Sequence, residues 1–151
     1  MRPLRSFLRL PPARRRLLLQ AAPLVAAVRV ALWILPFRIW RRPFAHTLRS
    51  LTPASSHRRH RMEHVAWAVE RASRIVPRAS CLTQALATQV LLARAGYPSQ
   101  LRIGVARGAR QDLEAHAWVE SGGRLVIGAG GTERYAPLPV PGAECVYEQR
   151  R

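Results

Sequence analysis

The stretch EAHAWVESGGRLVIG, at residues 114–128, constrains the fold of this chain more than any other. Its two arms carry strand-forming residues in alternation, and the Ser-Gly-Gly between them suits a tight turn. We therefore predict two antiparallel strands, over 115–120 and 124–128. Side chains alternate along a strand, so three polar or aromatic residues share one face of the first strand: His116, Trp118 and Glu120.

Further strands are predicted on both sides of this hairpin. The segment QLRIGV at 100–105 alternates in the same way and predicts a third antiparallel strand. The tail RYAPLPVPGAECVYEQ contains three prolines. Because proline cannot donate a ladder hydrogen bond, the tail predicts only one short edge segment.

Two helices are predicted before the sheet. The first begins near Ser55, where serine can cap it, and ends at Pro77. The second begins at Cys81 with Ser80 as its N-cap, and ends at Gly96. This order predicts an α+β fold in which the helix bearing the cysteine packs on a small antiparallel sheet.

Residues 1–53 predict a basic, helical amino-terminal segment in front of a core domain over 54–151. The apolar run at 17–28 is twelve residues long, whereas a bilayer-spanning helix needs about 20. Export or membrane spanning is therefore the less favoured alternative. We expect a helical hairpin or a broken helix, kinked at Pro23 and ended near Pro36, that packs on the core or lies against a partner or membrane surface.

Positive charge is concentrated in the amino-terminal part of the chain. All 25 basic residues are arginine, and fourteen of them precede the first acidic residue, Glu63. Such a segment suits an acidic peptide, an acidic protein face or anionic lipid. No nucleic-acid partner is expected, because the tryptophans are not interleaved with the arginine clusters. A merely solubilising face is the alternative.

The chain has two cysteines, Cys81 and Cys145, too few for a disulfide framework, which favours a reduced, cytoplasmic setting. Cys145 has no activating neighbour in sequence, so we expect it to pack or to lie on the surface. Cys81 falls in the first turn of a helix, where unpaired amides favour a reactive thiolate. Considered alone, it would be interpreted as a small apolar residue packed at a helix start.

His116 changes this interpretation of Cys81. It follows the cysteine by 35 residues and lies on a predicted strand. Cysteine hydrolases and acyltransferases need such a pair, because an imidazole takes the thiol proton and later protonates the leaving amine.

These motifs resemble the transglutaminase-like leader peptidases of lasso-peptide biosynthesis, the stand-alone peptidase form of the B protein. The resemblance covers about residues 60–140, with CL opening the helix, IGV on the strand and HAWVE before the glycine turn. It implies a papain- or transglutaminase-like core in which Cys81 is the nucleophile and His116 the general base. The family often has an aspartate about where Gly128 stands, so this chain departs from the pattern there.

The group that orients His116 is therefore open. Regular pairing across the hairpin sets His116 opposite Ala129 and Ala117 opposite Gly128, and neither partner can hold an imidazole through its side chain. A backbone carbonyl or a water could serve instead. Three carboxylates lie nearby in sequence: Asp112, Glu114 and Glu133.

The resemblance implies a cysteine peptidase that cleaves the leader from a ribosomally made lasso-precursor peptide and frees the core amine for cyclisation. It also implies a winged-helix leader-binding partner and a separate ATP-dependent lasso cyclase, which the basic amino-terminal part is a candidate to contact. The cleavage needs no metal or cofactor. The three histidines of the first helix are interpreted as part of a solvated basic face: His57, His60 and His64.

Two other interpretations stay open. The same Cys–His pair would serve a papain-like, amide-forming acyltransferase, in which a free amine outcompetes water. Gly128 at the expected aspartate position also suits a catalytically degenerate member of the family that acts as an assembly partner.

Overall fold

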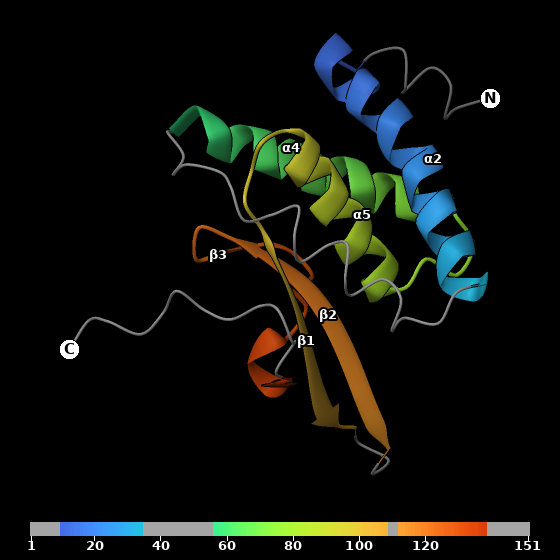
Figure 1. Ribbon diagram of the computed structural model, residues 1–151, viewed down its shortest axis with the longest axis vertical. Helices are drawn as coiled ribbons and strands as arrows, with labels where there is room; N and C mark the ends of the chain where they lie inside the picture. Colours follow the sequence, from blue (N-terminus) through green and yellow to red (C-terminus); the bar gives the residue numbers. More distant parts are fainter. Residues whose placement is uncertain (1–9, 35–55, 109–111, 139–151) are drawn as a thin grey trace.

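The structure is a computed structural model that describes residues 10–34, 56–108 and 112–138, with side chains in the second range from residue 61 onward. In these ranges three helices precede a four-stranded sheet (Figure 1). The helices are α2 (Pro12–Ile34), α4 (Ser56–Ser73) and α5 (Cys81–Arg94). The strands are β1 (Gln100–Arg107), β2 (Leu113–Ser121), β3 (Arg124–Ile127) and β4 (Ala136–Pro137), and a 3₁₀ turn (Thr132–Arg134) precedes β4.

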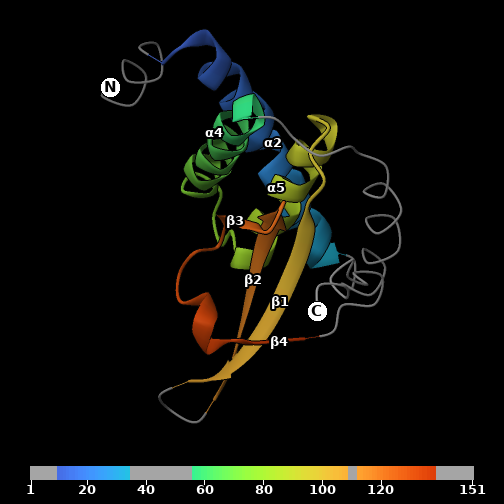
Figure 2. The same cartoon turned by 90° about the vertical axis from the view of Figure 1, so that its left-hand side faces the viewer.

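The sheet has the order β3-β2-β1-β4, and every neighbouring pair is antiparallel. The predicted α+β fold with a small antiparallel sheet is thus confirmed. β1 and β2 pair along their lengths, with Gly104 opposite His116. β4 adds to the other edge of β1, at Gly104 and Val105, as the short edge strand that the prolines predicted (Figure 2).

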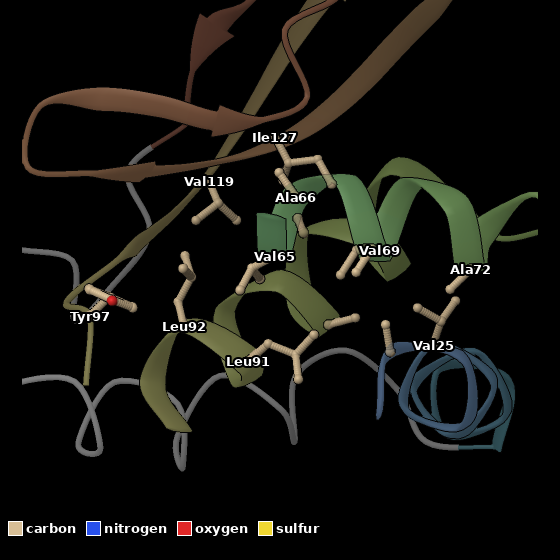
Figure 3. Close-up of a cluster of buried hydrophobic side chains, with 14 of the residues drawn as sticks. Val25, Val65, Ala66, Val69, Ala72, Leu91, Leu92, Tyr97, Val119 and Ile127 are labelled. Carbon is tan, nitrogen blue, oxygen red and sulfur yellow. The ribbon is translucent and has the colours of Figure 1, made fainter. Parts of the chain in front are cut away.

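The hydrophobic core lies between the helices and one face of the sheet. Val119 of β2 and Ile127 of β3 point toward α4 and α5 (Figure 3). Ala117 belongs to the same buried cluster as Val119. Because side chains alternate along β2, His116 and Trp118 belong to the opposite face of the sheet, as predicted.

α2 runs without interruption through Pro23, where we expected a kink or a break. A proline inside a helix removes one backbone hydrogen bond. Packing offsets that loss, because α2 contacts both α4 and α5 through a face of small apolar residues: Ala21, Val25 and Val28. The expected end near Pro36 lies outside the described residues.

With 23 residues, α2 is long and apolar enough to cross a bilayer, so our estimate that the apolar run is too short was wrong. The core helix of a soluble protein or a signal sequence can have the same length and apolar composition, so these two properties alone do not identify a membrane span. α2 shares its buried cluster with α4 and α5. The division of the chain at residue 53 therefore stays a prediction.

Candidate active site

Cys81 is the first residue of α5, and Ser80 caps the helix, as predicted. Ser80 has an extended backbone (φ −80°, ψ 169°), and its hydroxyl accepts a hydrogen bond from the Thr83 backbone N–H at 3.3 Å. A second contact joins the two side chains: the hydroxyl oxygens of Ser80 and Thr83 lie 3.1 Å apart. The Cys81 thiol is free and half-buried. As the first residue of α5, Cys81 lies where the backbone N–H groups of a helix have no hydrogen-bond partner within the helix.

Replacing Ser80 by alanine should lower the free energy of unfolding by about 1 kcal/mol, because the Thr83 N–H loses its side-chain acceptor. Thermal denaturation followed by circular dichroism should show a midpoint roughly 4 °C lower. Ser80→Asp keeps an acceptor at the cap and is the matched control. An equal loss in Ser80→Asp would show that the cap is not what stabilises this helix start.

The imidazole of His116 is held by a backbone carbonyl. Its Nε2 donates a hydrogen bond to the carbonyl oxygen of Gly128 at 2.9 Å. A carbonyl only accepts, so the ring proton is on Nε2, and Nδ1 is the basic nitrogen of the neutral ring. The Gly128 carbonyl thus takes the orienting role for which sequence offered several candidates. Within the described residues, none of the three nearby carboxylates hydrogen-bonds this ring.

A β-bulge changes the register that the hairpin sequence predicted. Next to Val119, β3 contains one extra residue relative to β2. Gly128 therefore lies against Trp118. A Cβ added to Gly128 would lie 2.7 Å from the Cβ of Trp118. The predicted pairs, with Ala117 opposite Gly128, were wrong by one residue. A bulge shifts the pairing of all later residues of one strand by one position relative to its partner strand. No residue in this turn predicts the bulge.

Two aromatic rings fix the imidazole further. The rings of Tyr135 and Trp118 lie 5.1 and 6.1 Å from that of His116, centroid to centroid, and both are stacked on it. The Trp118 indole N–H donates to Glu120 at 2.9 Å, and Glu120 pairs with Arg102 at 3.3 Å. These contacts hold the imidazole in one orientation on the sheet.

Tyr135 is in turn fixed by Glu114 and Arg134. Its hydroxyl donates to Glu114 at 3.4 Å and accepts from Arg134 at 2.7 Å, and Arg134 pairs with Glu114 at 2.9 Å. The hydrogen bond with Tyr135, and after it the Glu114 carboxylate, raises the pKa of Arg134. Sequence reasoning missed this support, because nothing in the sequence brings the segment after the hairpin back over His116.

Cys81 and His116 lie on neighbouring elements, because α5 packs on β2. Cys81 contacts the hydrophobic core, whereas His116 lies on the face of β2 opposite to the core residue Ala117. Among the described residues, no hydrogen bond joins the thiol to the imidazole. The structure therefore brings the two predicted residues onto adjoining elements but does not pair them.

A polar hollow of about 430 Å³ borders α4 and α5. Its lining consists of Glu70, Ser73, Arg74 and Gln84. Gln84 lies one helical turn after Cys81, so the hollow adjoins the start of α5. The Ser73 hydroxyl is buried without a hydrogen-bond partner in the described part of the chain. The hollow is thus lined by charged and polar side chains beside the start of α5.

Other residues considered from the sequence lie elsewhere. The His64 Nε2 is 3.2 Å from the Arg14 guanidinium, which also lies over the Trp67 ring at 5.4 Å. Cys145 and the side chains of His57 and His60 lie outside the described residues. Within the ranges that the structure describes, no three metal-ligating side chains cluster.

A cysteine at the start of a helix, packed on an antiparallel sheet that carries a histidine, is the arrangement of papain-like cysteine peptidases and acyltransferases. A family model described as the transglutaminase-like superfamily matches residues 24–140, and the chain belongs to this superfamily. Its members are typically cysteine-dependent enzymes. No curated protein and no solved structure matches the chain.

Proposed function

We propose that this protein is a cysteine peptidase that removes the leader from a ribosomally made lasso-precursor peptide. The main support is the Cys81 thiol at the capped start of α5, in a chain of the transglutaminase-like superfamily. The lasso assignment rests on the sequence resemblance alone. The proposed partners are the precursor, a winged-helix leader-binding protein and an ATP-dependent cyclase, in the cytoplasm.

In the proposed reaction, His116 takes the proton of the Cys81 thiol at Nδ1, and the thiolate attacks the carbonyl carbon of the leader–core amide. Backbone N–H groups at the start of α5 stabilise the oxyanion. His116 then protonates the departing core amine as the C–N bond breaks, which leaves the leader as a thioester on Cys81. A water that gives its proton to His116 hydrolyses the thioester. The leader leaves with a new carboxylate, and Cys81 recovers its proton.

This reaction requires the thiol and the imidazole to meet. Catalytic hydrogen bonds are often long or poorly aligned without substrate and tighten in the complex, so the proposal requires Cys81 and His116 to approach each other when the precursor binds. The Gly128 carbonyl on Nε2 supports it, because the bond leaves Nδ1 as the proton acceptor.

Mass spectrometry of a precursor peptide, incubated with the protein and the leader-binding partner in water labelled with heavy oxygen, tests this function. We expect one cut at the leader–core junction and heavy oxygen in the new leader carboxylate. With a free amine added, the leader should still end in a carboxylate. An amide to that amine would indicate an acyltransferase, and intact peptide with folded protein would contradict both enzyme proposals.

The second candidate is a catalytically degenerate member that acts as an assembly partner. It is supported by one specific observation: His116 stacks with the rings of Trp118 and Tyr135 on the sheet face opposite to the core and makes no hydrogen bond to Cys81 among the described residues. In that case His116 holds the loop after β3 in place, and Cys81 only packs. Such a protein should stimulate leader removal by other components without needing its thiol.

A further inference from the structure

The outward face of α2 is apolar, and no other described part of the chain covers it. The face that packs on α4 and α5 is itself apolar, so α2 is apolar on both sides. The large outward side chains have exposed fractions of 40% or more: Leu19 61%, Val30 52%, Trp33 82% and Ile34 69%. A helix that is apolar all round is typical of one that is covered on every side, by protein or by lipid. The exposed face of α2 therefore suits a surface of protein or lipid that would remove it from water.

The exposed residues form one continuous stripe along the helix. Its members follow each other at intervals of three or four residues, and each is exposed: Arg16, Leu19, Pro23, Ala27, Val30 and Ile34. The exposed Gln20 and Trp33 flank this stripe, and Gln20 adds one uncharged polar group to it. Such spacing places them on one side of the helix. No charged residue interrupts the stripe between Arg16 and Ile34. The buried residues, such as Val25, lie on the other side.

Charge and aromatic placement point to the kind of surface that this stripe fits. Arg16 is exposed at its amino end, and the chain has fourteen arginines and no acidic residue before Glu63. Trp33 lies at the carboxyl end, and tryptophan side chains prefer the boundary between lipid and water. An acidic protein face would pair with the arginines but leave the long apolar stripe without a counterpart. An anionic bilayer supplies a counterpart to both.

We propose that α2 docks this protein on the surface of an anionic lipid bilayer. The helix lies in the plane of the interface, with the stripe at the boundary of headgroups and acyl chains and the exposed Arg16 near lipid phosphates. The opposite face stays packed on α4 and α5, because spanning the bilayer would strip the core of Ala21 and Val25. The inference is independent of the peptidase proposal.

Sedimentation of the full chain with vesicles tests the docking. The protein should sediment with vesicles of phosphatidylcholine and phosphatidylglycerol, and much less with phosphatidylcholine alone. The double variant Leu19→Asp/Trp33→Asp should bind at least about tenfold more weakly, because two large apolar side chains no longer enter the interface. Ile75→Asp is the matched control, since Ile75 is 71% exposed but lies outside α2. It should bind like the wild type.

Circular dichroism should show that all variants are folded, as expected for changes at exposed positions. Equal binding to both kinds of vesicle, or equal loss in the control and the double variant, would overturn the proposal. Absence of wild-type binding would also overturn it, and light scattering would then show whether a second copy covers the stripe. Resistance of the bound protein to alkaline carbonate would indicate a spanning helix and overturn surface docking.

Discussion

Cys81→Ala should reduce the rate of leader cleavage by at least about 10⁴-fold, because losing the nucleophile of a catalytic unit removes nearly all of its acceleration. His116→Gln should reduce the rate by about 10³-fold. Glutamine retains an N–H donor that can reach the Gly128 carbonyl, but it has no basic nitrogen to take the thiol proton. Single-turnover kinetics of leader release, followed by chromatography, measures both losses.

The controls separate catalysis from folding. Cys145→Ala should cleave at the wild-type rate, because only the Cys81 thiol is proposed to react. The thermal midpoints of Cys81→Ala and His116→Gln should stay close to that of the wild type, so that the loss lies in the chemistry. Wild-type rates in His116→Gln would refute the general-base role. A fully active Cys81→Ala would leave only the assembly-partner candidate.

The elements that sequence predicted well are those with local signals. The start of α5 follows from Ser80, whose hydroxyl meets the Thr83 N–H in the structure as a capping serine should. β2 and β3 follow from alternation around two glycines that both have positive φ in the turn. The shortness of β4 follows from the missing N–H of proline. In each case a few neighbouring residues decide the outcome.

The features that sequence predicted badly depend on contacts between distant residues. Pro23 does not break α2, because burial of Val25 against α4 and α5 outweighs the local penalty. The bulge beside Val119 has no marker in the turn, so regular pairing was the natural assumption. Tyr135 reaches His116 only because β4 returns to the edge of β1.

The candidate site shows the same division. Local patterns place Cys81 on a helix start and His116 on a strand. Whether the two approach each other depends on the face of β2 that meets α5, and sequence order alone does not determine this. The group that orients His116 could not be predicted from residue types either. It is the backbone carbonyl of Gly128, and any residue at that position would have such a carbonyl.

Gly128→Ala should lower the free energy of unfolding by about 3 kcal/mol, a large loss for one methyl group. Gly128 has φ +91°, which is unfavourable for an L-residue, and an added Cβ would lie 2.7 Å from the Trp118 Cβ and 3.0 Å from the Ala117 carbonyl oxygen. Neither atom can move without a shift of β2. Urea denaturation followed by tryptophan fluorescence measures the loss.

Two other glycines separate the causes of this loss. Gly123 also has positive φ, +74°, but an added Cβ would meet nothing within 4 Å, so Gly123→Ala should cost only the backbone strain of about 1 kcal/mol. Gly130 has open space and needs no positive φ, so Gly130→Ala should be close to neutral. If Gly128→Ala costs no more than Gly123→Ala, the contact with Trp118 is not what demands glycine.

The steric cause also bears on the aspartate that the resemblance to lasso leader peptidases led us to expect near position 128. Aspartate at position 128 would bring the same Cβ against Trp118, so Gly128→Asp should destabilise the chain at least as much as Gly128→Ala. A side-chain carboxylate and this placement of Trp118 are therefore mutually exclusive at the present bulge. The backbone carbonyl of Gly128 orients His116 in a way that the packing of Trp118 allows, and only a repacked sheet face would let an aspartate replace it.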